Sequence, residues 1–256
     1  MQKVIACIDG SLISDSVCDA AAWAASILQA PLTLLHTVEK PQLSESDLSG
    51  TIGVDTRDAL MLALADLDAK RNKLAIEHGK EILAVAKQRA LDDGAAQVEL
   101  LQRHGDVLDA LEENADRIRL IVMGRHGTSG SVSNHIGSHA ERTTRVRQEP
   151  ILLTVGDFTP PRNFMLAYDG RSTSVNALKR VAESPLLQGL PCHIVSVGEE
   201  NVTNNARLAD AKQFMLDFGF EVTAELIPGN IFNVLNTYKN HQGIELLVMG
   251  AYGHSA

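Results

Sequence analysis

The segment LIVMGRHG (residues 120–127) recurs as LLVMGAYG (residues 246–253), 126 residues further along the chain. In both copies a short apolar run ends in glycine, which is the pattern of a buried strand followed by a tight turn. Segments that recur at a long, fixed spacing are typical of a duplicated structural unit. The sequence therefore predicts two related units in tandem.

A second pair of matching segments lies upstream of the first pair. VIACIDGS (residues 4–11) matches FMLAYDGRS (residues 164–172), which places Asp9 opposite Asp169 at an offset of 160 residues. Because this offset exceeds the other by 34 residues, the first unit must carry extra sequence, which we place at about residues 39–75.

Thr159, Pro160 and Pro161 lie between the two units. Paired prolines cannot continue a helix or a central strand, so these residues mark a linker. We expect one domain at residues 1–157 and a second at residues 162–256.

Short β-type runs alternate with helical patterns in each unit, which favours an α/β fold with a parallel sheet and right-handed crossovers. Residues 39–57, rich in Ser, Asp and Gly, are expected to form a long surface loop, either a tolerated insertion or a lid. Residues 59–91 read as a long helical stretch with at most one break. The pair Gly105-Asp106 corresponds to Gly229-Asn230. In the first unit the expected strands are residues 3–8, 31–38, 97–103, 119–123 and 150–155, and the other helices Ser14–Leu28 and 106–114.

The composition is that of a globular protein, with 45% hydrophobic and 21% charged residues. Twenty-three basic against 32 acidic side chains give a net charge of −9, which opposes nonspecific attraction to nucleic acid or anionic lipid. No run approaches the roughly 20 apolar residues that cross a bilayer, so we expect a cytoplasmic protein. Cys7, Cys18 and Cys192 are odd in number and lack CxxC spacing, so neither a disulfide framework nor a thiolate zinc site is expected.

A glycine-rich segment follows the strand that ends the first unit's LIVM run. Gly124 and Gly127 come directly after this strand, and Gly137-Ser138 follows nine residues later, where a helix is expected to open. Glycine permits positive φ and close backbone approach, and a helix start presents unpaired amides with a positive dipole end. These features select phosphate, although a plain turn followed by a capped helix has the same pattern.

Asp9 ends the first strand, with Gly10 and Ser11 beside it. The carboxyl ends of parallel strands border the ligand crevice where strand order reverses, so this carboxylate could accept hydrogen bonds from ribose hydroxyls or an adenine amino group. The alternative is an N-cap for the helix that starts near Ser11 or Leu12.

Together these residues resemble the ATP-binding branch of the universal stress protein family. The resemblance rests on Asp9, on the run LLHTV (residues 34–38), and on the spacing of Gly124, Gly127 and Gly137-Ser138. It covers essentially the whole chain as two tandem copies of one Rossmann-like (adenine nucleotide alpha hydrolase-like) domain with an open five-stranded parallel sheet. The resemblance implicates in binding Asp9, Thr37, Met123, Gly124, Gly127, Gly137 and Ser138, with Arg125, His126 and Ser129 as less certain candidates.

In that family the aspartate lies near the nucleoside, and the residue after the strand-two histidine contacts adenine through its backbone, which here implies Asp9 and Thr37. His139 departs from the small or aliphatic residue that the family usually has after the serine. Its side chain could crowd or hydrogen-bond the phosphate tail. The implied ligand is therefore ATP, or ADP or AMP, with or without Mg²⁺.

The second unit departs further from the pattern. It has Asp169, Gly250 and Gly253, but the counterparts of Gly137 and Ser138 would fall at positions 263 and 264, and that of the fifth strand at positions 276–281, past residue 256. We therefore expect an incomplete second copy that cannot build the full phosphate cradle from the residues shown.

Signatures of an enzyme are weak. The sequence has no Walker lysine, kinase loop set or nucleophile elbow, and His126, His135 and His139 fall short of a zinc ligand set. We expect no catalytic or metal site but a stress-response protein in which nucleotide binding acts as a regulatory switch, with at most slow ATP hydrolysis. The alternatives are a scaffold without nucleotide, which could hold an apolar ligand in the second unit, and a slow ATPase.

The family resemblance also implies pairing through fifth strands. The run ILLTV (residues 151–155) would leave an exposed apolar edge, which pairing with a second chain would cover. We therefore expect a homodimer, together with protein partners that the sequence does not identify.

Overall fold

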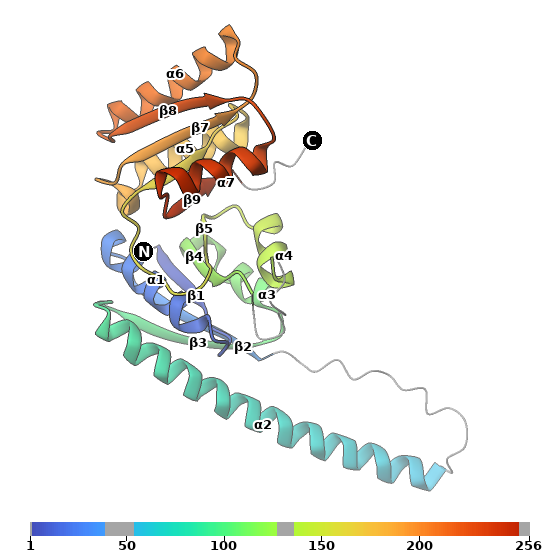
Figure 1. The fold of residues 1–256 in the computed structure, drawn as a ribbon. Helices are drawn as coiled ribbons and strands as arrows, with labels where there is room; N and C mark the ends of the chain where they lie inside the picture. Colours follow the sequence, from blue (N-terminus) through green and yellow to red (C-terminus); the bar gives the residue numbers. More distant parts are fainter. Residues whose placement is uncertain (1, 39–53, 127–135, 251–256) are drawn as a thin grey trace. The chain divides into compact units, whose positions relative to one another are not determined.

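In the computed structural model, which describes residues 2–38, 54–126 and 136–250 (the side chains of residues 54–60 excepted), the chain divides into two units. The first comprises residues 1–143 with 148–158, and the second residues 144–147 with 159–256. The first unit holds five parallel strands in the order β3-β2-β1-β4-β5 (Figure 1). They are β1 (Lys3–Cys7), β2 (Leu32–Val38), β3 (Val98–His104), β4 (Ile118–Gly124) and β5 (Ile151–Thr154).

Helices cover both faces of this sheet. The helices of the first unit are α1 (Ser14–Leu28), α2 (Val54–Asp92), α3 (Val107–Glu112), the 3-10 turn η1 (Ala115–Arg117) and α4 (Ser138–Val146), of which the last three residues are assigned to the second unit. Ile5, Leu35 and Ile121 form one core with residues of α3 and α4. Because side chains alternate along a strand, Val4 and Ala6 face the other way, toward the layer of α1 and α2. The central strands are therefore apolar on both faces, as parallel sheets require.

The second unit repeats this topology with four described strands in the order β8-β7-β6-β9. Its elements are β6 (Phe164–Ala167), α5 (Ser172–Glu183), the 3-10 turn η2 (Pro185–Leu187), β7 (Cys192–Val197), α6 (Val202–Asp217), β8 (Val222–Ile227), α7 (Ile231–Gln242) and β9 (Leu246–Met249). Strand β9 takes the place of β4 beside the first strand of its unit. The predicted tandem α/β fold is confirmed.

The extra sequence of the first unit lies largely in α2, which has 39 residues where its counterpart α6 has 16. The helix has no break, but one expectation was wrong, because residues 54–57 belong to this helix rather than to a loop. A continuous Ala-, Leu- and Lys-rich stretch without Pro favours one helix, and its apolar spacing did not show where it begins. The rest of the expected loop, residues 39–53, lies outside the described residues.

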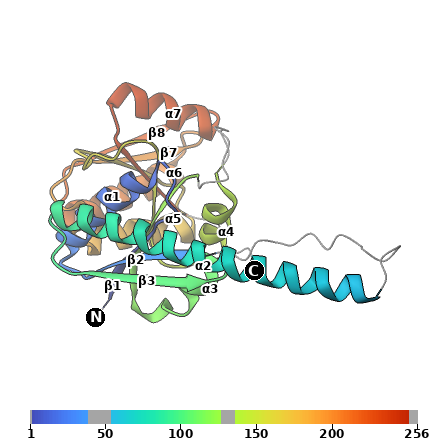
Figure 2. The same cartoon turned by 90° about the horizontal axis from the view of Figure 1, so that it is seen from below.

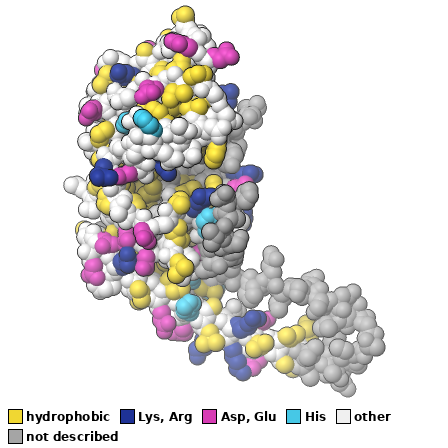
Figure 3. All heavy atoms as spheres, viewed as in Figure 1, with side chains coloured by type: hydrophobic (Ala, Val, Ile, Leu, Met, Phe, Trp, Pro, Cys, Tyr) yellow, Lys and Arg dark blue, Asp and Glu magenta, His cyan; other side chains and the backbone are white. Residues whose placement is uncertain are grey.

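Only the later part of α2 packs on the sheet. Leu83, Ala86 and Ala90 are buried, whereas Leu62 and Leu74 are 73% and 70% exposed. Figure 2 shows the helix continuing past the sheet of its unit, and Figure 3 shows hydrophobic side chains beside basic ones on this exposed portion.

Gly79 lets α2 approach the ends of β2 and β3. A Cβ at this position would lie 2.6 Å from His36 Cδ2 and closer still to Gln102 Nε2. Neither neighbour is free to retreat, because His36 Nδ1 donates to the Ile8 carbonyl at 2.7 Å and Gln102 Nε2 donates to the Ile76 carbonyl at 3.1 Å.

We therefore expect Gly79→Ala to lower the free energy of unfolding by about 1 to 3 kcal/mol, the usual cost of overpacking. Helix propensity alone would raise it by about 1 kcal/mol. Urea unfolding measures whether Gly79→Ala lowers or raises the free energy of unfolding. Ala84→Gly, at an exposed position of the same helix, supplies the propensity effect by itself. If Gly79→Ala stabilises the protein, α2 does not approach His36 and Gln102 closely enough to exclude a methyl group.

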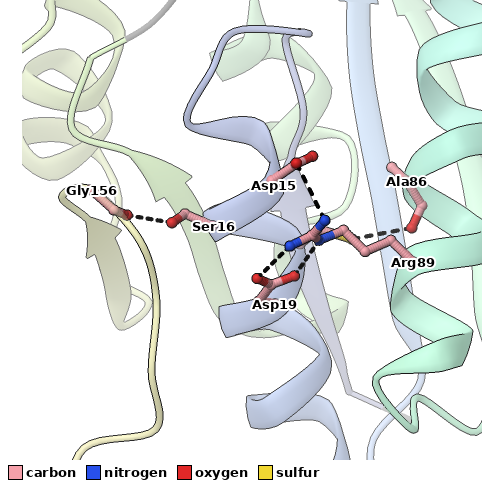
Figure 4. A network of polar contacts seen from close by, with 7 residues as sticks. Asp15, Ser16, Asp19, Ala86, Arg89 and Gly156 are labelled. Atoms are coloured by element: carbon pink, nitrogen blue, oxygen red, sulfur yellow. Dashed lines mark hydrogen bonds and ion pairs between the residues drawn. The ribbon is translucent and has the colours of Figure 1, made fainter.

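An arginine on α2 joins this helix to α1 (Figure 4). Arg89 donates from Nη2 to Asp19 Oδ2 at 2.8 Å, from Nε to the other oxygen of Asp19, and from Nη1 to Asp15 Oδ2 at 3.2 Å. The hydrogen bond from Arg89 is the main reason that the pKa of Asp19 lies below its ordinary value. Figure 4 also shows Ser16 on α1 turned the other way, toward the Gly156 carbonyl after β5.

Arg89→Met should lower the free energy of unfolding at pH 7 by about 1 kcal/mol or less, because the arginine side chain is 41% exposed and solvent screens the pair. The folded pKa of Asp19 is depressed, so the stabilisation is present above the ordinary pKa and is lost as the pH falls through the folded value. The difference between the variant and the parent should shrink below about pH 4. Urea unfolding at pH 7, 5 and 3.5 measures it.

Lys70→Met is the matched control, since its partner Asp66 lies on the same helix and both side chains are at least 64% exposed. It should change stability by a few tenths of a kcal/mol at most. An Arg89→Met loss that is independent of pH would mean that apolar contact, not charge, joins the two helices.

Candidate functional site

The loops that follow β1 and β4 leave the same edge of the first sheet. Both strands are parallel and adjacent, and the order β3-β2-β1-β4-β5 reverses direction between them. Ligands in open α/β sheets bind at the carboxyl edge beside such a reversal. Asp9, Thr37 and Gly124 all lie at this edge.

Asp9 organises the loop after β1. Its Oδ1 accepts hydrogen bonds from the Ser11 amide and the Ser14 hydroxyl, both at 3.0 Å. Helix α1 begins at Ser14 with Ile13 in the N-cap position, so the alternative of Asp9 as the helix N-cap is wrong. The Ser11 hydroxyl is buried and has no hydrogen-bond partner among the described residues.

Gly10 is the one position of this loop that needs glycine. Its φ is +76°, in the left-handed region, and a Cβ would lie 2.7 Å from Ile82 Cδ1 on α2. The loop is therefore pressed against the same turn of α2 that packs on His36.

The backbone of Thr37 faces the β1 side of β2, past the last residue of β1. The Leu35 carbonyl accepts from the Ile8 amide at 2.8 Å, on the β1 side, whereas the Val38 carbonyl accepts from Gly105 at 3.1 Å, on the β3 side. Backbone groups alternate in direction along a strand, so Thr37 faces the same side as Leu35. Since β1 ends at Cys7, Thr37 and Asp9 both lie past its end, at the carboxyl edge of the sheet.

Gly124 allows close packing rather than the positive φ that we expected. The sequence predicted positive φ at the loop glycines, but neither Gly124 nor Gly137 adopts it. Instead, a Cβ at Gly124 would lie 2.5 Å from Ile13 Cγ2. A Cβ at Gly250 in the second unit would likewise lie 2.7 Å from the carbonyl carbon of Thr173. Each glycine lets the turn after the first strand lie directly on the end of its neighbour.

Arg125 and Gly137 are joined by a backbone hydrogen bond. The Gly137 amide donates to the Arg125 carbonyl at 2.7 Å, so it does not point freely toward a ligand as the sequence suggested. Ser138 opens α4 as predicted and is exposed. Gly127 and Ser129 lie outside the described residues.

The remaining candidates differ in burial. Met123 is 4% exposed and its side chain belongs to the core, so only its backbone reaches the edge. Arg125, His126 and His139 are half-buried near this edge, and Arg125 and His139 also make polar or electrostatic contacts.

The ion pair between Asp106 and Arg142 was not predicted from the sequence. Asp106 Oδ1 accepts from the Leu108 amide at 2.8 Å as the N-cap of α3, and its Oδ2 accepts from Arg142 Nη1 on α4 at 2.7 Å. Burial opposes ionisation, but the Leu108 amide and Arg142 outweigh it and lower the pKa of Asp106. The match with Asn230 indicated the cap, whereas no spacing signal indicated Arg142.

The corresponding edge of the second unit carries a different charge pattern. Asp169 Oδ1 accepts from the Arg171 amide at 2.9 Å and from the Ser174 hydroxyl at 2.7 Å, as Asp9 does in the first unit. Arg171 stands where the first unit has Ser11, and its guanidinium lies 3.6 Å from Asp169 Oδ2. These contacts outweigh burial and lower the pKa of Asp169.

Other chemistry finds little support in the part of the chain that the structure describes. Within it, no three His, Cys, Asp or Glu side chains cluster so that they could hold a metal ion. Burial raises the pKa of the Cys7, Cys18 and Cys192 thiols to about 12, so none is a thiolate at neutral pH. None of the described helices is long and apolar enough to span a membrane.

Two tandem sheets of this topology, each with an aspartate at the carboxyl end of its first strand, define a duplicated Rossmann-type α/β protein. The model of the universal stress protein family matches residues 1–154. The universal stress protein Slr1230 of Synechocystis is 32% identical over 261 residues, which cover 100% of this chain and 91% of the relative. The chain belongs to the universal stress protein family.

A solved structure that spans nearly the whole chain shows the same fold. A universal stress protein from Archaeoglobus fulgidus covers 99% of this chain and 89% of its own length, with a TM-score of 0.74 and 17% identity. A universal stress protein solved in complex with cAMP covers 60% of this chain and 95% of its own, with a TM-score of 0.41 and 24% identity.

Proposed function

We propose that the first unit binds an adenine nucleotide at the edge between β1 and β4, and that binding serves as a regulatory switch in the stress response. The observation that supports this proposal is that Asp9 and Thr37 lie past the carboxyl ends of two neighbouring parallel strands, next to the reversal of strand order. An adenine ring between them would meet the Thr37 amide and carbonyl, while the ribose hydroxyls would donate to Asp9.

The residues at this edge fit such a ligand. The Ser11 hydroxyl is buried and has no hydrogen-bond partner in the part of the chain that the structure describes, so a ligand oxygen would satisfy it. Phosphates would extend toward Ser138, where the first turn of α4 offers unpaired amides and a positive dipole end. Because the Gly137 amide is already used, we assign the rest of the cradle to Gly127, Ser129 and the backbone of Gly124 to His126.

The ligand is ATP, ADP or AMP, with Mg²⁺ carried on the phosphates. Because the sequence has no Walker lysine, we infer that the first unit acts as a binding module with hydrolysis at most slow. The second unit plays a different role, because Arg171 partly neutralises its aspartate. We assign the two domains to residues 1–157 and 162–256, in a cytoplasmic protein.

The same proposal includes a homodimer through β5. This strand is the outer one of its sheet, and Ile151, Leu152 and Leu153 are only half-buried. Pairing with β5 of a second chain would satisfy its open backbone edge and cover these side chains.

Asp9→Asn is the sharpest test of the nucleotide site. Asparagine keeps the oxygen that accepts from Ser11 and Ser14, so the loop should survive, but it loses the charge that strengthens hydrogen bonds from ribose. We expect the affinity for Mg-ATP, measured by isothermal titration calorimetry, to fall about tenfold. Asp169→Asn, at the matching position of the second unit, should leave it unchanged.

Gly127→Val and Ser138→Ala should also weaken ATP binding, and mass spectrometry of denatured protein should detect nucleotide that copurifies. Unchanged affinity in all three first-unit variants would refute the assignment. A parent protein that binds no nucleotide would favour the scaffold alternative, and rapid release of inorganic phosphate would favour an ATPase.

A further inference from the structure

Helix α4, which opens at the proposed phosphate end, has little apolar anchoring. Of its nine residues only Ala140 and Thr143 are buried, and both side chains are small. The Thr143 hydroxyl donates to the His139 carbonyl of the same helix at 2.7 Å, so it adds no tie to the sheet. By contrast, α1 buries nine of its 15 residues. Because burial supplies most of the packing free energy, polar contacts must contribute more to the placement of α4 than to that of α1.

The contact between Asp106 and Arg142 is suited to this role. Asp106 lies between β3 and α3, at the same carboxyl edge as Asp9, and its two oxygens have separate partners. Oδ1 is fixed by the Leu108 amide, and Oδ2 accepts a charge-assisted hydrogen bond from Arg142 Nη1 at 2.7 Å. Since the cap holds the carboxylate still, the second oxygen gives α4 a defined position relative to the sheet edge.

We propose that Asp106 and Arg142 are positioning residues that hold α4 so that its first turn meets the phosphates of a bound nucleotide. This inference rests on the proposed function. The pair does not touch the nucleotide but acts through the orientation of Ser138 and the neighbouring amides. It therefore governs affinity for the phosphate chain and leaves adenosine recognition, at Asp9 and Thr37, unaffected.

The second unit shows how to separate the N-cap of α3 from the contact between Asp106 and Arg142. Asn230 stands at the position of Asp106, and its Oδ1 accepts from the Asn233 amide at 3.2 Å as the cap of α7. Asparagine thus supports the cap without a charge. Asp106→Asn should keep α3 capped and weaken only the contact with Arg142.

The first experiment compares the affinities for Mg-ATP and for adenosine by calorimetry in Asp106→Asn, Arg142→Gln and Arg142→Lys. A partly exposed ion pair predicts about three- to fivefold weaker ATP binding in the first two variants. Adenosine affinity should not change, and lysine at position 142 should restore most of the loss. Glu245→Gln, which breaks the Arg162–Glu245 pair of the second unit, is the control and should change neither affinity.

Two outcomes would overturn the inference. Equal losses of ATP and adenosine affinity would indicate general destabilisation. A loss in Arg142→Gln without one in Asp106→Asn would indicate that Arg142 contacts phosphate directly.

The second experiment needs no nucleotide, so it separates this inference from the proposed function. Hydrogen exchange should become faster at the backbone amides of residues 140–143 in both Asp106→Asn and Arg142→Gln, and should not change in β1 or α1. Unchanged exchange in α4 would refute the positioning role, even if the parent protein binds ATP. Faster exchange in a parent protein that binds no nucleotide would show that the pair holds α4, while the proposed function and the role toward phosphate would both fail.

Discussion

The close approach of the turn after the first strand to the glycine that ends its neighbour is the constraint on which each unit depends. Ile13 lies on Gly124 in the first unit, and Thr173 lies on Gly250 in the second. Any side chain at these glycines would push the turn away from the sheet. The same approach brings Asp9 to the reversal point of the strand order, where an open parallel sheet offers a crevice.

Helix α2 supports the opposite side of that turn. Gly10 packs against Ile82, and Gly79 packs against His36, whose ring is fixed by the Ile8 carbonyl. The ends of β1 and β2 therefore pack against the same turn of α2. Arg89, further along α2, joins this helix to α1 through hydrogen bonds to Asp15 and Asp19. These contacts fix the conformation of the loop after β1 before any ligand binds.

The two units have kept the same skeleton with different polar groups. Both aspartates accept from the amide two residues later and from the serine hydroxyl five residues later. The first unit has Ser11 beside its aspartate, whereas the second has Arg171. A carboxylate beside a serine hydroxyl suits a neutral sugar, but one beside a guanidinium is partly neutralised. This difference supports assigning the nucleotide to the first unit alone.

Hydrophobic periodicity and internal repetition in the sequence were sufficient for the parallel α/β class, the order of elements, and the bounds of β-strands such as Leu32–Val38 to within about one residue. Those features are local, because strand and helix patterns depend on neighbours in the chain. The start of α2 at Val54, the contact of Gly124 with Ile13, the use of the Gly137 amide by Arg125 and the tie from Asp106 to Arg142 were decided by tertiary structure alone. Each of the last three joins residues that lie 12 to 111 positions apart, and only folding sets the distance between such atoms.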